Sequence, residues 1–329
     1  MPAGLSGSGW LGFAFETTKG TYEDPTIFIP ILSESFQYQE DRYYSPQIRQ
    51  ETIVSDVKQG YYHIEGDIEF EADVNFLPYL LFCTRHNIAK VAGPPPVYTY
   101  TPSDAGSTST AASGMVQRTA SITIVRNEIG FGYSGCTLGS LRLFIDEGIL
   151  KVAGNFIGEM DNVVAAPPTP TWAAPSLFGA DAHEISVGAS GLAPTFAAVE
   201  DFNGFEFEAN FNGEAQNRIV RDRSASYVSF GETELSLTTE LDFIDKTEYD
   251  AFVATTQKAI KLESLIGGAT FALATQAVEL IVYRGVYETY DLGLSGLGDL
   301  IMAGVTMRGI GIAGGDGYAI RVKTPVDIT

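Results

Sequence analysis

The sequence predicts a mainly β protein made of two tandem copies of one β-sandwich or barrel domain, each with one short flanking helix and a long hairpin arm. Glycine (35 residues), tyrosine (16) and phenylalanine (20) are abundant and helical patterns are few, which favours strands. Residues 62–72 alternate apolar and charged side chains, as does a strand with one packed and one solvated side. A second alternating stretch at 234–243 indicates an internal duplication.

The first alternating strand is expected to lead into a short helix. Its apolar side runs from Ile64 to Ala72, and its polar side carries His63, Glu65, Asp67, Glu69 and Glu71. Asp73 and Asn75 offer N-cap oxygens for a helix over 76–82, and Pro78 is tolerable because it falls in the first turn. Like charges on one strand face repel each other, so a chain that keeps them there is expected to use that face.

The other elements of the first half follow in chain order. They are a Gly/Ser-rich start (1–9), extended runs at 10–15 and 26–32, a strand at 35–39, a polar arm at 40–60, a loop with one short strand at 87–113, a strand at 119–126, and a hairpin of 140–145 with 148–157. The arm is too long for a tight turn and is therefore expected to project. The hairpin is predicted from its Asp146-Glu147-Gly148 turn.

The second half is predicted to repeat this order. Its elements are a strand at 205–208 matching 36–39, an arm at 210–226, the alternating strand at 232–243, a helix capped by Asp245 or Thr247, a strand at 276–283 matching 119–126, and a hairpin at 292–312; the loop after the helix is much shorter. An Ala/Pro-rich stretch at 163–175 separates the halves. We therefore predict domains at 1–165 and 176–329, joined by a linker at 166–175.

The net charge of −21 argues against a protein that grips nucleic acid, because gripping needs Lys and Arg to displace counterions. The same charge is compatible with a surface that nucleic acid must pass without sticking. Cys83 and Cys136 do not make a disulfide framework and are expected to be free thiols. No signal peptide and no apolar run of about 18 residues is seen, so folding in a reducing cytoplasm is expected.

No motif predicts a cofactor or a metal. Two stretches, 130–135 and 309–314, match the G-x-G-x-x-G string, but a dinucleotide site needs a following helix, and strand glycines are the expected alternative. The three histidines lie far apart, without ligand spacing. Glu65 and Glu69 could in principle form the carboxylate pair of a glycosidase. The alternative explanation is that they belong to a solvated charged face without catalytic function.

Three stretches of the first half carry a family resemblance: Gly12 to Thr21, Phe28 to Pro30, and Glu34 to Phe36. Together with the strand-helix unit 64–82 and the strands at 121–157, they resemble the major tail tube protein of long-tailed, siphovirus-like bacteriophages. In that family each tube domain is a β-sandwich with one helix and a long hairpin, and rings of six domains close a β-barrel whose lumen conducts the genome. The duplication departs from the single-domain form and resembles the variant in which two fused domains let three chains make a pseudo-sixfold ring.

The resemblance implies roles for two sets of residues. The lumen-lining candidates are Gln37, Gln39, Glu65, Asp67, Glu69, Glu71, Glu206, Glu208, Glu234, Glu240 and Asp242. The candidates for contacts between subunits lie in the two arms and are Arg42, Arg49, Lys58, Arg218, Arg221 and Arg223. It also implies a non-enzymatic virion protein made in the host cytoplasm, with further copies of itself, a tape-measure protein, tail-end proteins and passing double-stranded DNA as partners, and with no membrane.

Three other readings stay open at this point. A secreted or surface β-sandwich that binds carbohydrate or protein would show exposed aromatic platforms on loops. A carboxylate hydrolase would hold Glu65 or Glu69 in a deep pocket. A baseplate hub or a capsid-decoration protein would share the virion but not the tube.

Overall fold

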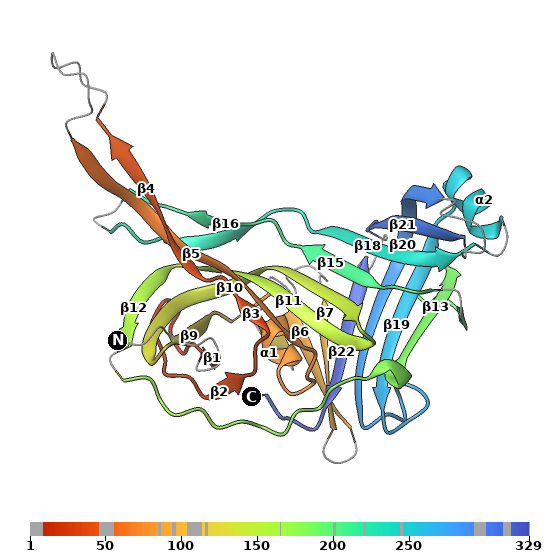
Figure 1. Ribbon diagram of the computed structural model, residues 1–329, viewed down its shortest axis with the longest axis horizontal. Coiled ribbons are helices and arrows are strands. Elements are labelled where there is room, and N and C mark those ends of the chain that lie inside the picture. Colours follow the sequence, from red (N-terminus) through yellow and green to blue (C-terminus); the bar gives the residue numbers. More distant parts are fainter. Residues whose placement is uncertain are drawn as a thin grey trace.

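The computed structural model confirms the mainly β prediction (Figure 1). It describes residues 9–45, 56–84, 87–93, 97–103, 114–115, 118–164, 166–199, 202–219, 222–243, 246–292, 301–311 and 317–328. The first half contains β1 (Trp10–Phe15), β2 (Ile27–Ile29), β3 (Ser33–Glu34), β4 (Gln37–Tyr44), β5 (Val57–Glu71), α1 (Leu77–Phe82), β6 (Asn87–Gly93), β7 (Val97–Ser103), β8 (Gly114–Met115), β9 (Ala120–Arg126), β10 (Ile129–Asp146), β11 (Ile149–Gly158) and β12 (Met160–Val164). The second half contains η2 (Ala180–Ala182), β13 (His183–Ala189), β14 (Phe196–Ala198), β15 (Glu206–Asn210), β16 (Gly213–Gln216), β17 (Tyr227–Phe230), β18 (Glu234–Asp242), α2 (Thr247–Val253), β19 (Lys258–Ile266), β20 (Gln276–Leu292), β21 (Met302–Gly309) and β22 (Tyr318–Thr324).

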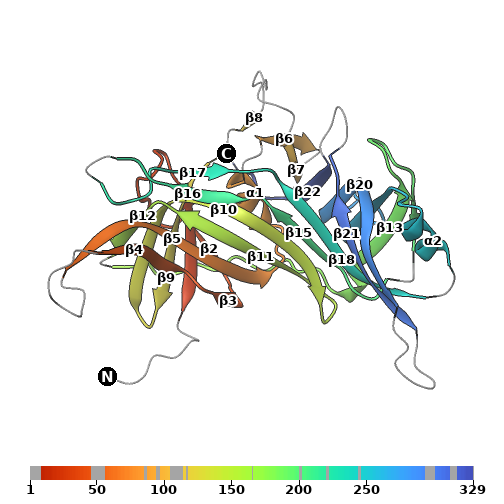
Figure 2. The same cartoon turned by 90° about the horizontal axis from the view of Figure 1, so that it is seen from above.

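The two halves lie side by side and share one order of strand pairing (Figures 1 and 2). In the first half, one layer is β2-β1-β9-β10-β12 and the other is β4-β5-β11-β10. In the second half, the layers are β14-β13-β19-β20-β22 and β15-β18-β21-β20. The long strands β10 and β20 each serve both layers of their half. The identical order confirms the predicted duplication.

Residues 33–83 and 204–254 correspond one to one. Tyr38 faces Ile64 as Ala209 faces Leu235, and the backbone N–H of Ala72 binds Leu150 O as that of Phe243 binds Ile301 O. This register corrects the predicted match of 205–208 with 36–39, because Phe207 takes the place of Phe36. The predicted match of 276–283 with 119–126 is also wrong, since β19 pairs with β13 and β20 as β9 pairs with β1 and β10.

The layer that contains β5 and β18 continues from one half into the other. Strand β10 pairs antiparallel with β15, from Ser140 facing Asn210 to Phe144 facing Glu206. One sheet, which we call the shared sheet, therefore runs β4-β5-β11-β10-β15-β18-β21-β20. The halves also share one hydrophobic core cluster. Residues 167–176 have no helix or strand, but because the core is shared, the domain boundaries at 165 and 176 stay a prediction.

The second layer is joined through an insertion that only the first half carries. After α1, the described strands β6, β7 and β8 pair with one another, and β7 pairs with β22 of the second half. In the second half α2 leads directly to β19, which confirms the predicted shorter loop. The insertion thus extends the second-half layer to β14-β13-β19-β20-β22-β7-β6-β8.

The helices form where they were expected, but their caps differ from the prediction. The first helix has buried Leu77, Leu80 and Phe82, has Pro78 in its first turn, and begins after Phe76 without a side-chain cap. Asp73 is instead used just upstream, where its Oδ1 accepts the N–H of Asn75 at 2.8 Å. The second helix begins after Lys246, also without a side-chain cap, so Thr247 lies inside it. Asp245 lies outside the described residues.

Cys83 and Cys136 are free and buried, as predicted. Burial raises the pKa of both thiols, because an apolar surrounding disfavours the thiolate. Within the described residues, no helix is long and apolar enough to cross a membrane.

Candidate functional site: the acidic face of the shared sheet

All of the predicted lumen-lining residues lie on one face of the shared sheet, which we call the acidic face. Directly opposed residues of paired strands point to the same side, so the register fixes the face. Gln37 faces Glu65, and Glu206 faces Thr238. One row of opposed residues crosses both halves and consists of Glu69, Ala153, Arg142, Glu208, Ser236 and Arg308.

The opposite face of the same strands is packed. Ile64, Ile68 and Phe70 are at most 1% exposed, and Leu235 and Leu237 are also buried. On the acidic face the predicted lumen residues are all half-buried or exposed. The alternation therefore divides the strands as predicted, into a core side and a solvated side.

Neutral donors hold some of these carboxylates in place. Asp67 Oδ1 accepts the side-chain amide of Asn155 at 3.0 Å, and its Oδ2 accepts the hydroxyl of Ser35 at 3.2 Å. Asp242 Oδ1 accepts the side-chain amide of Asn203 at 2.5 Å. Hydrogen bonds from neutral groups orient a carboxylate and leave its charge in place.

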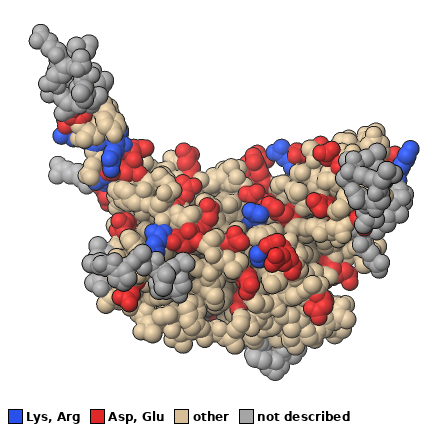
Figure 3. Space-filling model, in the orientation of Figure 1, with Lys and Arg blue, Asp and Glu red and all other residues tan. Residues whose placement is uncertain are grey.

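The basic side chains described on the face are each held by a carboxylate. Arg142 Nε lies 2.8 Å from Glu206 Oε1, with its guanidinium 4.4 Å from the centre of the Phe144 ring. Lys151 contacts Asp146 at 2.5 Å, and Arg308 contacts Glu288 at 3.6 Å. Among the described residues no ion pair reaches carboxylates such as Asp67, Glu69 or Glu240, so the face keeps an excess of negative charge. Figure 3 shows carboxylates outnumbering basic side chains over the visible surface.

Several residues of the face were not predicted. They belong to β10, β11 and β21, for which the sequence predicts only hairpins, and are Arg142, Phe144, Lys151, Asn155 and Arg308. A usable signal was present in β11, where Lys151 and Asn155 alternate with buried Leu150, Val152 and Phe156.

The first arm, formed by β4 with β5 beyond Asp41 and Gly60, projects from the body (Figure 1). The Arg42 and Lys58 side chains on it are 64% and 72% exposed. Their ion pairs are local, with Arg42 Nε 3.6 Å from Glu40 and Lys58 Nζ 3.5 Å from Asp56. Arg49 lies outside the described residues.

The second arm, β16 paired with β17 and their connection, lies against the first half of the same chain. Arg223, predicted to contact another subunit, also binds groups of its own chain. Its guanidinium binds Glu40, Gln59 Oε1 at 2.8 Å and Gly60 O at 2.9 Å, because the arm folds back onto β5. Arg218 stacks on Tyr227 of its own arm at 5.1 Å, and Arg221 lies outside the described residues.

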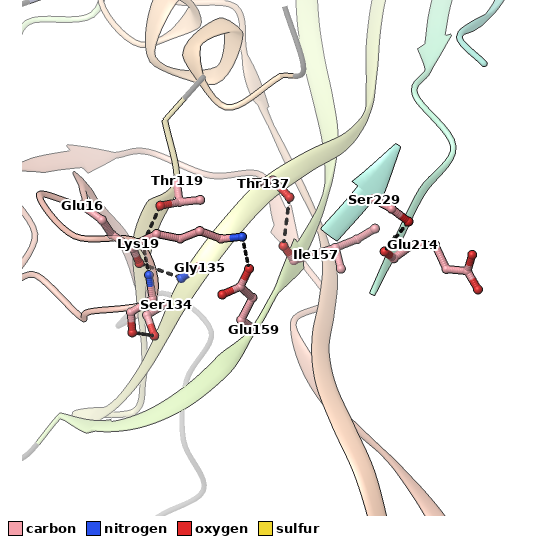
Figure 4. Close-up of polar contacts among 11 residues, drawn as sticks. Glu16, Lys19, Thr119, Ser134, Gly135, Thr137, Ile157, Glu159, Glu214 and Ser229 are labelled. Carbon is pink, nitrogen blue, oxygen red and sulfur yellow. Dashed lines mark hydrogen bonds and ion pairs between the residues drawn. The ribbon is translucent and has the colours of Figure 1, made fainter. Parts of the chain in front are cut away.

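A second polar cluster connects the loop after β1 to β10 and to the residues next to β9 and β11 (Figure 4). Glu16 accepts hydrogen bonds from Gly20 N at 2.7 Å, Gly135 N at 2.6 Å and Thr119 Oγ1 at 2.6 Å. Lys19 lies 2.7 Å from Glu159, whose pKa is raised by burial. These contacts satisfy backbone and side-chain donors of the loop and of β10, which is a structural role.

The remaining sequence motifs also have structural explanations. Gly130 to Gly135 lie within β10, and Gly135 has a φ of 69°, where a Cβ would be 2.8 Å from Glu159. Gly309 ends β21, and residues 312–314 lie outside the described part. Glu65 is 47% exposed at its side chain on an open face, unlike the enclosed carboxylate that a glycosidase acid requires. Within the described residues, no group of His, Cys, Asp and Glu could hold a metal ion.

The described chain is therefore a duplicated β-sandwich whose shared sheet carries one continuous acidic face. A family model for phage tail tube proteins matches residues 10–321. The chain therefore belongs to the phage tail tube protein family and is a structural component of a virion tail. No curated protein matches the chain.

Proposed function

We propose that three copies of this chain close a pseudo-sixfold ring, that rings stack into the tail tube, and that the acidic face lines the lumen through which double-stranded DNA passes. The observation that carries the proposal is the pairing of β10 with β15, which joins two equivalent halves through one sheet. A tape-measure protein inside the lumen, proteins at the tube ends and synthesis in the host cytoplasm belong to the same proposal. The two halves, 1–165 and 176–329, would act as equivalent ring units.

The internal junction is the pairing of β10 with β15. The two edge strands of the shared sheet are the counterparts of these two strands in the other half. The counterpart of β15 in the first half is β3–β4, and the counterpart of β10 in the second half is β20. Within the described residues, β4 pairs only with β5, and the stretch of β20 from Gly285 to Leu292 pairs only with β21 apart from one contact of Gly285 with β19. The shift in pairing register that β10 shows between Leu138 and Ser140 also recurs in β20, between Tyr287 and Thr289. Pairing β20 of one copy with β4 of the next would close the sheet and remove its open edges.

The electrostatics fit passage without binding. Specific and non-specific DNA binding both depend on basic groups that replace counterions. On the acidic face the described arginines and lysine are already held by carboxylates. A wall with excess carboxylates repels phosphates and so keeps a sliding duplex from sticking.

The first test joins neighbouring copies by a disulfide. The internal junction has Arg142 facing Glu208, and the equivalent positions between copies are Asp291 and Gln37. Hydrogen bonds from Ile145 N to Phe205 O and from Phe211 N to Gly139 O place Arg142 and Glu208 at a non-hydrogen-bonded pair, where Cα atoms lie about 4.5 Å apart and a disulfide fits. We expect assembled rings of the Gln37→Cys, Asp291→Cys variant to give covalent trimers on non-reducing gels.

Two control variants show whether cross-linking depends on the proposed register of β20 with β4 or only on the two strands being near each other. Arg142→Cys with Glu208→Cys is expected to cross-link within the chain and run as a monomer. Gln39→Cys with Asp291→Cys is displaced by two residues, at a diagonal distance of about 7–8 Å, and is expected to cross-link poorly. Equal cross-linking of the in-register and displaced pairs would refute the pairing of β20 with β4.

The second test reverses charge on the acidic face. We expect Glu65→Lys with Glu69→Lys to leave tube assembly intact while lowering DNA delivery, because free lysines would bind phosphates. The control is Glu128→Lys with Asp250→Lys, which makes the same charge change away from that face. Infectivity per assembled particle, counted by electron microscopy and plaque titre, is the measurement. Loss of assembly with unchanged delivery by the residual particles would show that these residues do not line the lumen.

A further inference from the structure

Aromatic side chains gather at both edges of the shared sheet. At the β4 edge, which we call the Tyr38 edge, Tyr38 stacks on Tyr62 with ring centroids 4.7 Å apart. At the β20 edge, which we call the Tyr290 edge, the Tyr290 ring lies 5.7 Å from that of Tyr249 and 6.0 Å from that of Phe252, both on α2. Strand β4 and helix α2 lie at opposite ends of the molecule (Figure 1), so the two aromatic groups do not meet within one copy.

Both groups lie on the side of the shared sheet opposite the acidic face. Tyr38 faces the buried Ile64, and Tyr290 faces the buried Val305, and opposed residues point to the same side of a sheet. Tyr38 is nevertheless 42% exposed and Tyr249 is 43% exposed. Clustered large aromatics that stay open on the core side of a sheet are an informative exception to ordinary burial.

The internal junction shows what occupies the equivalent position between the two halves. There Leu141 of β10 faces Ala209 of β15, and both residues are fully buried. The counterpart of Leu141 in β20 is Tyr290, because the shift in register recurs at the same distance before it. The counterpart of Ala209 in β4 is Tyr38. A leucine and an alanine inside the chain are thus replaced by two tyrosines at the edges that meet in the proposed ring.

The larger side chains have room because the second half lacks the insertion. In the first half the insertion covers α1, where Phe82 is fully buried and Tyr100 packs edge-on against it at 5.8 Å. The counterpart of Phe82 in α2 is Val253, which is 64% exposed. Among the residues of α2, all of which the structure describes, only Ala251 is buried. The place that Tyr100 takes beside α1 is therefore open beside α2, and aromatic rings of a partner can enter it.

Polar contacts within the chain hold each aromatic group in place. Glu248 of α2 accepts hydrogen bonds from the Tyr287 hydroxyl at 2.6 Å and from Lys258 Nζ at 2.6 Å, which fixes the helix to β20 and β19. At the other edge, the Arg223 guanidinium lies 5.7 Å from the centre of the Tyr62 ring. Side chains that are already ordered lose little conformational entropy on association.

The charges near these tyrosines are compatible with a contact between copies. In the register of the internal junction, Glu40 of one copy would face Glu288 of the next. Arg223 binds the first of these carboxylates, and Arg308 lies 3.6 Å from the second. Each carboxylate therefore brings its own counter-charge to the junction, so repulsion between the two is reduced.

We propose that Tyr290, with Tyr249 and Phe252 of α2, packs against the Tyr38–Tyr62 pair of the next copy, and that this aromatic contact determines which edges join when the ring closes. The inference rests on the proposed ring, because the two edges meet only between copies. Tyr290 and Tyr38 would form a hydrogen-bonded strand pair, as Leu141 and Ala209 do, with Cα atoms about 5.5 Å apart. Opposed aromatic residues stabilise paired strands, and tyrosines are enriched among the residues that dominate binding energy.

Photo-oxidation with a ruthenium bipyridine complex and persulfate, which joins tyrosines in contact as dityrosine, tests the pairing. Light and isotopically heavy chains are mixed before assembly, cross-linked and analysed by mass spectrometry. We expect a Tyr38–Tyr290 link that joins light to heavy chains. Tyr38→Phe should abolish this link and leave assembly unchanged, because it keeps the aromatic ring. Links from Tyr290 that reach neither Tyr38 nor Tyr62 of another chain would overturn the inference.

Truncation of the tyrosines tests their weight in assembly. We expect Tyr290→Ala, and separately Tyr38→Ala, to raise the concentration needed for ring formation on the order of tenfold, as for residues that dominate an interface. The two changes combined should cost less than the product of the single effects, because each removes the same contact. Trp172→Ala is the matched control, since it truncates an aromatic that is 50% exposed in the segment between the halves, and it should have little effect. Circular dichroism of the dilute chains checks that each variant is folded.

The outcomes separate this inference from the proposed function. Rings from Tyr290→Ala and from Tyr38→Ala at the wild-type concentration would refute the aromatic contact and leave the ring standing. If a truncated chain does not fold, the cross-linking of the wild-type chain still decides. Failure of the wild-type chain to form rings or tubes would refute the proposed function, and this inference with it.

Discussion

Replacing Tyr100 with alanine is expected to lower the free energy of unfolding by about 4 kcal/mol, the usual cost of truncating a buried aromatic. Tyr100 is fully buried and packs edge-on against Phe82, with ring centroids 5.8 Å apart. Its hydroxyl donates to Val326 O at 3.1 Å and accepts the N–H of Ile328 at 2.8 Å. One side chain therefore ties the insertion of the first half to the end of the chain. Chemical unfolding of the full chain measures the loss.

Tyr100→Phe separates the hydroxyl from the ring. It keeps the packing but leaves the half-buried C=O of Val326 and the buried N–H of Ile328 without their partner, at a cost of about 1–3 kcal/mol. Faster digestion of the C-terminal end by carboxypeptidase is the specific readout. Tyr44→Phe, at a side chain that is 58% exposed, is the matched control and should change neither quantity. Equal digestion rates for Tyr100→Phe and the wild type would contradict the role of the hydroxyl.

Replacing Gly66 with alanine is expected to cost about 3 kcal/mol, at the upper end of the usual range for overpacking. A Cβ at this position would lie 2.6 Å from Phe36 N and 2.7 Å from Phe36 Cγ. The backbone cannot give way easily, and Phe36 is itself held in a stack with Tyr133 at 5.5 Å. The midpoint of thermal unfolding should fall by several degrees.

The matched control for this change is Gly304→Ala. Gly304 also lies in a strand of the shared sheet, but a Cβ there would meet nothing within 4 Å. Its effect should stay within about 0.5 kcal/mol, as for a surface position. A similar loss of stability in both variants would show that the general strand preference, and not the contact with Phe36, is responsible.

Local patterns were sufficient to predict the elements that alternate. Along β5 and β18 the apolar side is buried and the charged side is solvated, because side-chain direction in a strand depends only on sequence parity. The helices after them were predicted for the same kind of reason, from spacing and from Pro78. Their caps were not predicted correctly. The carboxylate of Asp73 accepts the backbone N–H of Asn75, so the first helix begins without a side-chain cap.

Strand partners could not be predicted in this way. Whether β19 or the start of β20 corresponds to β9 depends on pairing between distant residues, and the alternation of a single strand does not contain that information. The same limit applies to the acidic face. Arg142 and Arg308 join it only because β10 and β21 are placed between strands that carry the carboxylates. Likewise, the polar composition of the second arm predicts an exposed segment, whereas Arg223 fixes it to the first arm.

The insertion of the first half meets the connection between β19 and β20 (residues 267–275), which is longer than the two-residue turn between β9 and β10. Each half therefore carries one addition that the other lacks. Strand β7 of the first-half insertion pairs with β22, and a depression beside it is lined by Val91 and Thr99 on one side and Phe271 and Leu273 on the other. Both additions belong to the layer remote from the carboxylate-bearing strands. These two departures from exact repetition are thereby kept off the shared sheet, so this layer can change while the spacing of the repeated strands behind it stays the same.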